Sequence, residues 1–416
     1  MERNRVTIVG AGLAGLSAAS YLNRNGFSVT ICDAGSQIGG VVATDHVDGF
    51  FLDRGFQLVL DSYPEFRHLL DPSRLALKRF NRVLDFVDAE MNHKAFFDPR
   101  DHFQPKETLK MMRQFRPRDL VSLGRIATRV STADPKVLFE SPNETSYSYL
   151  RRLGFSHVAI EGFWRPFYRG VFLEKGLETS ARMLNFVTQN FLRGHACLPE
   201  TGIAEIPAQL AEALPQDSLR LGTQVTAFSD SAVETADGTV IDHDYLVVAT
   251  KADELCALSG DSSKDFGYRH VSNHYYATEA DFPASATVMI PSFPDTDILT
   301  VAVMDAVSPS YAPRRTHLIS VSTLEIEMDA TAHSATVASM LGIRATDLSP
   351  VRTYRIPRAL PKVFGSGHHG EPYFMALSSR VFVAGDFMEN PSIDGAIASG
   401  RKAAEAIMFA AARFGA

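Results

Sequence analysis

The sequence predicts an α/β fold in which an open parallel sheet of the Rossmann type is interrupted by an inserted α+β portion. Three observations support this prediction. A buried strand at Val6–Val9 runs straight into a glycine-rich turn and a helix. Another buried strand, a Gly-Asp turn and a final helix follow one another between Val381 and Ile407. With 416 residues, the chain is also too long for one ordinary domain and suits two.

The first turn has the spacing GxGxxG, and each of its glycines has a separate physical reason. Gly10 allows a tight turn after the strand, Gly12 lets the backbone approach a pyrophosphate, and Gly15 lets helix and strand pack closely. Leu13 and Ala14 begin the helix, whose N-terminus offers free N–H groups and a positive dipole end. The turn therefore predicts a site for the phosphates of a dinucleotide.

An acidic residue follows at the expected distance. The strand Ser28–Cys32 ends at Asp33 and Ala34, about 20 residues past the turn, where a carboxylate can accept both hydroxyls of a ribose. A glycine-rich turn in some other βα unit is the alternative interpretation. The strand before the turn, the helix after it and the acid together favour the dinucleotide site.

A second glycine pair, Gly39 and Gly40, follows the acid, and a nicotinamide dehydrogenase has no need of it. With the closing Gly-Asp motif, this pair resembles the flavin amine oxidase superfamily, which includes monoamine oxidases, protoporphyrinogen oxidases and phytoene desaturases. The resemblance implies an FAD cofactor whose pyrophosphate lies along the glycine pair. It also implies that three later residues approach the flavin, namely Gly55, Phe56 and Gln57.

The resemblance assigns further cofactor contacts in the middle and at the end of the chain. Val225 would back the adenine, and Gly385 with Asp386 would bring a carboxylate to the ribityl–phosphate part. The start of the last helix would bring backbone N–H groups to the pyrimidine edge of the flavin, at Ile393, Asp394, Gly395 and Ala396. A helix N-terminus at that place stabilises negative charge on the ring by its dipole.

The chain departs from the family pattern near the phosphates. Val41 is expected to contact the cofactor where the family commonly has arginine, so backbone N–H groups or another arginine, such as Arg54, would neutralise the phosphates. Asp33 replaces the commoner glutamate and has a shorter reach. The sequence has no secure counterpart of the lysine that many amine oxidases hold near the flavin. It also has no cysteine shortly before the closing motif, where monoamine oxidases attach their flavin, so FAD is expected to be non-covalent.

Composition excludes several other classes of protein. Hydrophobic residues at 45% and charged residues at 21% are typical of a soluble globular protein, and a net charge of −7 disfavours a nucleic-acid binder. The three cysteines form no CxxC pair, and His368 and His369 lack further ligands for a metal site. No signal peptide and no apolar run of spanning length is expected. These features predict a cytoplasmic protein without a metal.

Because the cofactor motifs are scattered, the cofactor domain is expected to be discontinuous. We assign residues 1–75, 195–260 and 371–416 to an FAD-binding domain, and residues 76–194 and 261–370 to a substrate domain. The first inserted segment has helical patterns at about 106–130, 147–153 and 156–172. The second alternates apolar and polar residues and carries prolines in its loops, which indicates an antiparallel sheet.

No catalytic residue can be named from the sequence, but a few residues are candidates for the substrate pocket. Trp164, Phe167 and Tyr168 lie in an aromatic run, FWRPFYR, that either lines a pocket or packs as a helix end with surface arginines. Lys362 either reaches the active site from the last strand of the substrate domain or is a solvated lysine.

These features predict an oxidoreductase in which FAD takes a hydride from a C–H or C–N bond of an apolar or ring-bearing small molecule. Electrons would pass to oxygen or a quinone, as the resemblance to protoporphyrinogen oxidases and phytoene desaturases implies. Two alternatives stay open: an amine oxidase, and a catalytically silent flavoprotein that serves as a binding partner.

The segment from Arg100 to Arg129 is unusually basic for an acidic protein and is interleaved with apolar residues. A basic amphipathic segment can lie on an anionic membrane surface. Alternatively, it is a solvated helical face whose apolar stripe packs on the substrate domain. Pro117 favours the second interpretation, because it breaks the helix and shortens its apolar face.

Overall fold

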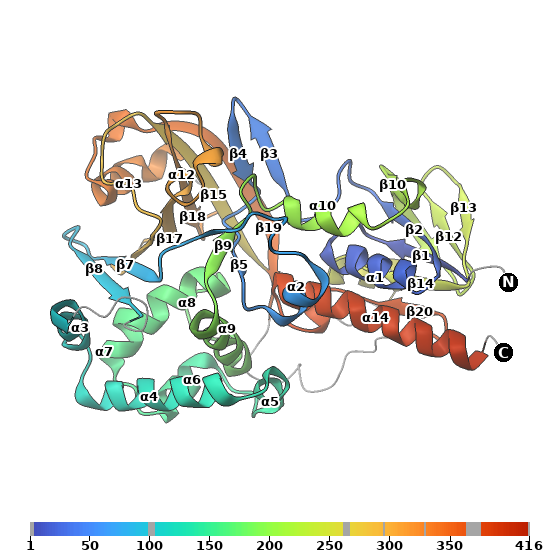
Figure 1. The fold of residues 1–416 in the computed structure, drawn as a ribbon, viewed down its shortest axis with the longest axis horizontal. Coiled ribbons are helices and arrows are strands. Elements are labelled where there is room, and N and C mark those ends of the chain that lie inside the picture. Colours follow the sequence, from blue (N-terminus) through green and yellow to red (C-terminus); the bar gives the residue numbers. More distant parts are fainter. Residues whose placement is uncertain are drawn as a thin grey trace.

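The computed structural model describes residues 4–98, 105–260, 267–293, 296–327, 330–362 and 376–414. His368, His369 and the first part of the basic segment, including Arg100, lie outside these residues. Figure 1 shows an elongated molecule whose two termini lie together at one end, with a second sheet and a group of helices at the other end. The predicted fold class, a Rossmann-like α/β domain with an inserted α+β portion, is confirmed.

A five-stranded parallel sheet forms the half that holds both termini. Its strand order is β10 (Leu219–Leu221), β2 (Ser28–Asp33), β1 (Arg5–Val9), β14 (Tyr245–Val248) and β20 (Val381–Val383). The central strands are buried almost throughout, as expected for a parallel sheet that is covered on both faces. The sheet therefore brings together strands from the start, the middle and the end of the chain.

Two helices that are remote in sequence pack side by side against this sheet. They are α1 (Leu13–Arg24) and α14 (Ile393–Phe414). Gly400 allows their close contact, since a Cβ atom there would lie 2.1 Å from the carbonyl oxygen of Ala14. Ser17 Oγ also donates a hydrogen bond to the carbonyl oxygen of Ile397 at 2.8 Å. The helix of the first motif is thus fixed to the helix of the last one.

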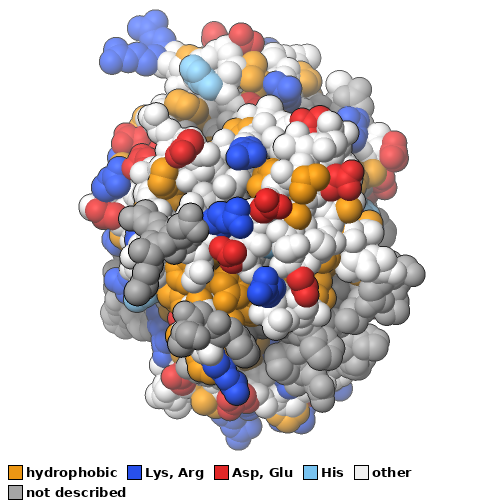
Figure 2. Space-filling view, turned by 90° about the vertical axis from the view of Figure 1, so that its right-hand side faces the viewer, with side chains coloured by type: hydrophobic (Ala, Val, Ile, Leu, Met, Phe, Trp, Pro, Cys, Tyr) orange, Lys and Arg blue, Asp and Glu red, His pale blue; other side chains and the backbone are white. Residues whose placement is uncertain are grey.

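Smaller elements complete this half. The three-stranded sheet β11 (Val225–Phe228), β12 (Ala232–Thr235) and β13 (Val240–Asp242) is antiparallel, and so is the pair β3 (Thr44–Val47) and β4 (Phe50–Asp53). β9 (Ala196–Leu198) pairs with both β5 (Val59–Leu60) and β6 (Lys78–Arg79). The helices are α2 (Pro64–Leu69), α10 (Glu205–Glu212) and α11 (Ala252–Ser259). In Figure 2, charges of both signs are interspersed over this end of the molecule.

A seven-stranded sheet forms one layer of the other half. Its order is β19 (Ser349–Pro361), β15 (Tyr268–Thr278), β18 (His317–Thr323), β17 (Ile298–Val303), β16 (Val288–Pro291), β7 (Val83–Val87) and β8 (His93–Phe97). The expected antiparallel pairing is observed except between β7 and β16, which are parallel. This exception joins the two inserted segments into one sheet. The short helices α12 (Met304–Val307) and α13 (Ser334–Leu341) lie beside it.

Helices of the first inserted segment form the second layer of this half (Figure 1). They are α3 (Pro105–Met112), α4 (Pro117–Thr132), α5 (Pro135–Glu140), α6 (Ser146–Arg152), α7 (His157–Ala159), α8 (Arg165–Phe172) and α9 (Ala181–Arg193). The expected break at Pro117 is present, because this proline begins α4. The buried carboxylate of Asp119 accepts hydrogen bonds from the backbone of Arg116 and Ser156, which fixes α4 to the start of α7.

The predicted domain division follows these two halves in part. The strands of the parallel sheet come from the segments assigned to the cofactor domain, and those of the seven-stranded sheet come from the segments assigned to the substrate domain. The small sheet β5-β9-β6 joins strands from both assignments. The exact boundaries stay a prediction.

Candidate active site

A single cavity of about 1280 Å³ extends from the carboxyl ends of the parallel strands into the half with the seven-stranded sheet. Its lining includes both glycine turns at one end and the aromatic residues of α8 at the other. Ligands of open α/β sheets bind at the carboxyl ends of the strands, so this is the expected place for a dinucleotide.

The three glycines of the first turn differ in what requires them. A Cβ atom on Gly10 would lie 2.5 Å from the carbonyl oxygen of Ala249, and one on Gly15 would lie 1.9 Å from that of Gly10. These two glycines are therefore needed by the fold. Gly12 has φ −73°, lines the cavity, and a Cβ atom there would meet nothing within 4 Å. Packing does not require glycine at position 12, and the open space in front of it lets a ligand approach the backbone.

The second glycine pair packs directly on the first turn. The N–H of Gly39 donates to the carbonyl oxygen of Ala11 at 2.8 Å, and both Gly39 and Gly40 have positive φ values. Asp33 accepts hydrogen bonds from the N–H groups of Ala11 at 2.6 Å and Gly35 at 2.7 Å. Its carboxylate thus stabilises the turn and also lines the cavity. These residues fit the adenosine and pyrophosphate parts of a dinucleotide.

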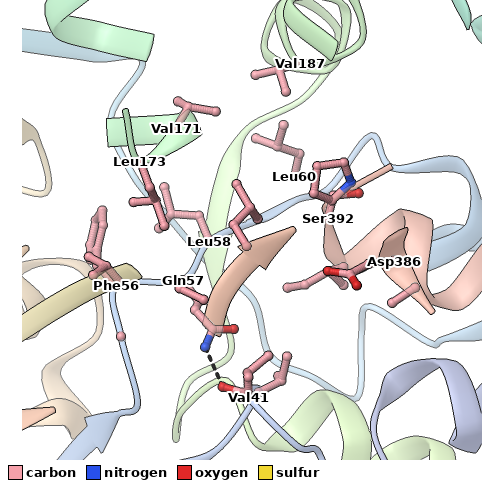
Figure 3. Close-up of a pocket in the computed structure, with 18 of the residues that line it drawn as sticks. Val41, Phe56, Gln57, Leu58, Leu60, Val171, Leu173, Val187, Asp386 and Ser392 are labelled. Carbon is pink, nitrogen blue, oxygen red and sulfur yellow. Dashed lines mark hydrogen bonds between the residues drawn. The ribbon is translucent and has the colours of Figure 1, made fainter. Parts of the chain in front are cut away.

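The residues expected to approach the flavin line the next part of the cavity. Gln57 Nε2 donates to the carbonyl oxygens of Val41 at 2.7 Å and Arg54 at 3.1 Å, which ties two loops together (Figure 3). Across the opening in Figure 3, Asp386 and Ser392 lie near the start of α14. Burial raises the pKa of Asp386 to about 6, because the charged carboxylate loses hydration there.

Most of the other predicted cofactor residues also line this cavity: Leu13, Ala14, Ala34, Gly55, Phe56, Val225, Gly385, Ile393 and Ala396. Gly15, Asp394 and Gly395 do not. Gly15 is needed for helix packing, and a Cβ atom on Gly395 would lie 2.0 Å from the carbonyl oxygen of Asn390. These glycines therefore serve the fold rather than provide the contact surface.

The side chain of Asp394 binds outside the cavity, while the predicted contact of its backbone N–H with the flavin stays a prediction. Its carboxylate accepts hydrogen bonds from the backbone N–H groups of Glu65 at 2.8 Å and Phe66 at 3.2 Å, at the N-terminus of α2. Burial raises the pKa of Asp394 to about 7. The side chain of Asp394 thus fixes α2 to α14 and is occupied outside the cavity.

The pocket beyond the flavin-binding end lies between the helical layer and the seven-stranded sheet. Of the pocket candidates, Trp164, Phe167 and Tyr168 line it, whereas Lys362 does not. The carbonyl oxygen of Gly267 accepts a hydrogen bond from the backbone of Lys362 at 3.2 Å, at the far end of β19. Val171 and Val187, from α8 and α9, face Leu58 and Leu60 across the opening in Figure 3.

A π-helical turn, Ile160–Trp164, brings the aromatic run to the pocket. Pro166 lies two residues after the turn and has no N–H group to donate, so a regular α-helical hydrogen bond cannot form at this point. Such turns are frequent at functional sites. Trp164 is 3% exposed, and its Nε1 atom has no hydrogen-bond partner among the described residues. It is therefore a buried donor in a cavity wall that is mostly apolar.

The sheet supplies the opposite wall of the pocket. Val271 and Ile356 contribute apolar surface, and Thr300 and Ser322 contribute two neighbouring hydroxyl groups. Ser322 Oγ donates to Oδ1 of the buried Asn273 at 2.9 Å, so its oxygen lone pairs can still accept a hydrogen bond from a ligand. The wall is thus mostly apolar with a small polar centre.

Several cavity residues were missed by the sequence analysis. Asn81 and Arg82 precede β7, Asp98 follows β8, and Lys251 follows β14. Arg82 donates to three carbonyl oxygens at the C-terminus of α9 and pairs with Asp98 at 3.7 Å. Lys251 lies three residues after the buried apolar strand β14, and this position was the available signal.

A buried carboxylate joins the two halves of the molecule beside the cavity. Asp53 is 1% exposed and accepts hydrogen bonds from Thr44 Oγ1 at 2.6 Å, Tyr311 Oη at 2.8 Å and the backbone N–H of Ile203 at 2.9 Å. Tyr275 Oη on β15 donates to the backbone carbonyl oxygen of Asp53 at 3.0 Å. Burial raises the pKa of Asp53 to about 6 despite these donors.

Comparison with known proteins agrees with this geometry. The model of the family described as flavin containing amine oxidoreductase matches residues 13–408 of the chain. The chain belongs to this family. The two glycine turns and the apolar pocket share one cavity, which suits the flavin that gives the family its description. The protein is a flavin-dependent oxidoreductase.

Curated relatives match over short stretches. Protoporphyrinogen oxidase 2 from Arabidopsis thaliana is 36% identical over 75 residues, which cover 18% of this chain and 15% of the relative. Phytoene desaturase from Fusarium fujikuroi is 29% identical over 112 residues, which cover 27% of this chain and 19% of the relative. The chain spans less than a third of the length of these relatives.

Solved structures with the same fold match over nearly the whole chain. A protein assigned as a protoporphyrinogen oxidase from Exiguobacterium sp. 255-15 has a TM-score of 0.73 at 18% identity, and the match covers 98% of this chain and 99% of that chain. Putrescine oxidase bound to putrescine has a TM-score of 0.70 at 17% identity, with coverage of 98% and 99%. At these identities the similarity shows the fold alone.

Proposed function

We propose that the protein is an FAD-dependent oxidoreductase that removes a hydride from a C–H or C–N bond of an apolar or ring-bearing small molecule, with oxygen or a quinone as electron acceptor. The observation that carries the proposal is the single cavity, which joins a dinucleotide-binding end to an apolar pocket. A bound flavin would supply the hydride acceptor. The residues of this chain hold the dinucleotide, orient the substrate and exclude water.

The charges in the pocket favour a neutral substrate over an amine cation. Of the acidic residues that line the described part of the cavity, Asp98 pairs with Arg82 and Glu254 pairs with Arg358. The other two, Asp33 and Asp386, belong to the turns of the cofactor end. An ammonium substrate would need an unpaired carboxylate or other negative charge to replace its hydration. This supports a protoporphyrinogen oxidase- or phytoene desaturase-like activity over an amine oxidase.

The polar groups of the sheet wall give the proposal a second detail. Thr300 and Ser322 would contact the substrate close to the flavin-binding end, and Asn273 holds the Ser322 hydroxyl in place. Pockets of this kind are mostly apolar, and a few placed polar groups fix the orientation of the ligand. A ring-bearing substrate with one N–H or O–H donor would satisfy this pattern.

The experiment that tests the proposal is anaerobic reduction of the bound flavin by candidate substrates. Protoporphyrinogen IX or phytoene should bleach the flavin absorbance within one turnover, whereas benzylamine and putrescine should not. Bleaching by the amines alone would instead establish the amine oxidase alternative. Bleaching by none of a broad set of apolar donors would favour the catalytically silent flavoprotein.

A pocket-filling variant checks that reduction occurs in this cavity. Val171→Trp should retain FAD but lose most flavin reduction, because the larger side chain would occupy the space between α8 and Leu58. Val158→Trp is the matched control, since Val158 is 51% exposed on α7. Equal reduction rates in both variants would exclude the cavity as the substrate site.

We also propose that the flavin is bound non-covalently. Cys32 is the cysteine that lines the described part of the cavity, and it lies on β2 at the adenosine end. Acid precipitation should therefore release FAD into the supernatant. Flavin that stays with the precipitate would contradict this proposal.

Contact with a membrane and a cytoplasmic location are proposals as well. No helix in the described part of the chain has the length and apolar character needed to span a membrane. α3 and α4 expose Leu109, Met112 and Val121, which are 51%, 40% and 54% exposed, next to basic side chains. The same segment also lines the cavity, through Met111 of α3, Phe115 between the two helices, and Leu123, Ile126 and Ala127 of α4. An anionic membrane bound there would deliver an oily substrate to the pocket.

A further inference from the structure

Four cationic side chains line the cavity within the described residues, and three of them already have an acidic partner. Arg54 pairs with Asp45 at 2.8 Å, Arg82 pairs with Asp98, and Arg358 pairs with Asp253 at 2.8 Å and Glu254 at 2.9 Å; the fourth is Lys251. Arg54 was expected to replace the arginine that the family has at position 41. Because Arg54 is paired with Asp45, it contributes little net positive charge to the cavity.

Lys251 forms no ion pair within the described residues, although the nearby carboxylates of Glu254, Asp253 and Asp386 partly offset the lowering of its pKa. Its Nζ atom donates to the carbonyl oxygen of Arg358 at 3.1 Å, which uses one of its three N–H donors. Burial lowers the pKa of Lys251, and the neighbouring guanidinium of Arg358 lowers it further. An ammonium in this position is costly to bury unless an anion joins it.

The position of Lys251 in the fold indicates which anion that is. β14 lies between β1 and β20, and Lys251 comes three residues after its last residue, Val248. The backbone just before Lys251 touches the first glycine turn, because Ala249 donates to the carbonyl oxygen of Val9 at 2.8 Å. On the other side, Val248 accepts a hydrogen bond from Ala384, next to the Gly-Asp turn. Lys251 therefore stands between the two turns that would hold the phosphates.

We propose that Lys251 binds the pyrophosphate of FAD and supplies the positive charge that Val41 does not. This inference rests on the proposed FAD cofactor. A charged lysine and a phosphate form a charge-assisted hydrogen bond, and the shielded edge of the cavity strengthens their attraction. The backbone N–H groups of the first turn and of α1 complete the binding of the phosphates.

The test compares binding of FAD, ADP and riboflavin to the apo forms of the parent and of Lys251→Met. The variant should bind FAD and ADP about 10- to 100-fold more weakly, since a hydrogen bond to a charged group is lost. Its affinity for riboflavin, which has no phosphate, should equal that of the parent. The FAD affinity of the variant should also fall less steeply as salt is raised.

Two further variants exclude trivial explanations. Lys251→Arg keeps the positive charge and should bind FAD within about threefold of the parent. Lys175→Met removes the same type of side chain on the surface, where Lys175 pairs with Asp297 at 3.2 Å, and should bind FAD normally. The apo form of Lys251→Met should be at least as resistant to heat as the parent, because its buried ammonium is gone.

The outcomes separate this inference from the proposed function. If the parent binds FAD and Lys251→Met binds it as tightly with the same salt response, the role of Lys251 is wrong and the cofactor assignment stands. An equal loss of riboflavin and FAD affinity would also reject the phosphate contact. A parent protein that takes up no FAD would reject the proposed function itself.

Discussion

The two ends of the cavity are built in different ways. At the cofactor end, backbone turns make the surface, and glycines at positions 10, 12, 39 and 40 allow the chain to approach itself and a ligand. At the substrate end, side chains make the surface, and they come from two layers that are distant in sequence. The glycines of the cofactor end have a spacing that can be recognised in the sequence. The residues of the substrate end are mostly apolar and would suit any hydrophobic core.

This difference teaches where sequence alone is informative. A backbone contact demands a particular residue, because few residues other than glycine fit without a clash or strain. An apolar wall accepts many residues of similar volume. We therefore expect a single substitution at the cofactor end to reduce FAD binding strongly. A substitution at the substrate end should change activity in proportion to the change in side-chain volume.

The largest expected effect is that of Gly12→Val. A side chain at position 12 would enter the open space of the cavity, so the fold should be retained while FAD affinity falls by more than about 1000-fold. The change is measured by FAD fluorescence quenching on apo protein, with circular dichroism to monitor folding. Gly15→Val is the contrasting variant and should disrupt the fold, since its Cβ atom would clash with the backbone at 1.9 Å. If Gly12→Val binds FAD like the parent, the cofactor end is wrongly placed.

The second prediction concerns Asp53, at the junction of the two halves. Its pKa is raised to about 6 by burial, so the folded protein holds this proton more tightly than the unfolded chain does. The resulting stabilisation is fully present below about pH 4 and is lost as pH rises through about 6, which amounts to about 3 kcal/mol. Urea unfolding from pH 4 to 7 should show the parent losing about 3 kcal/mol of stability relative to Asp53→Asn, which cannot titrate at this position.

Asp48→Asn is the matched control for that experiment, because Asp48 is exposed in the turn between β3 and β4. Its unfolding should parallel that of the parent at each pH. Parallel profiles for Asp53→Asn as well would mean that the junction carries no titrating group.

The third prediction concerns Asp33, at the cofactor end of the cavity. Asp33→Ala should weaken FAD binding by about 10- to 100-fold, since it removes charge-assisted hydrogen bonds to a ribose and to the N–H of Ala11. Because the carboxylate also holds the turn in the apo protein, Asp33→Asn should recover part of the loss. Unchanged FAD affinity in Asp33→Ala would show that the ribose lies elsewhere.

The smallest expected effect concerns the outer surface of the substrate half. Co-sedimentation with vesicles of anionic lipid should detect binding at low salt that fades at high salt. Neutralising Arg113, Arg116 and Arg118 by glutamine should reduce it, at about 1 kcal/mol for each charge near the surface.

The control neutralises three exposed arginines elsewhere, Arg67, Arg220 and Arg380, and should bind vesicles like the parent. Equal loss in both triple variants would indicate a general charge effect. If the parent does not bind at low salt, α3 and α4 form a solvated face instead.

The sequence predicts the cofactor end because its constraints are local. The strand, turn and helix around Gly10–Gly15 and the last helix are where they were expected, and Gly39 packs on the first turn. The broad division into helical and sheet layers in the inserted segments was also predicted, since it depends on periodicity.

The rest could not be predicted because it depends on contacts between remote segments. Nothing local distinguishes Asp394, which binds α2, from Asp386, which lines the cavity. The role proposed for Lys251 follows from comparison with Arg54 and Arg358, which have acidic partners, whereas Lys251 has no ion pair in the described part of the chain. The parallel pair β7–β16 joins residues about 200 positions apart, and the sequence of neither strand indicates which strand it pairs with.

The same scattered pairing constrains how the protein is made. β1 finds its neighbour β14 only after residue 248 has left the ribosome, and β7 must wait for β16 at residues 288–291. At a synthesis rate of about 5–20 residues per second, β1 stays without this partner for roughly 10–50 s. During that interval the nascent chain exposes apolar strand edges and the aromatic helices of the first insertion. Translation through β20 is therefore a condition for burying them, and a chain stopped before residue 381 would leave the parallel sheet open at β14 as a substrate for chaperones and proteases.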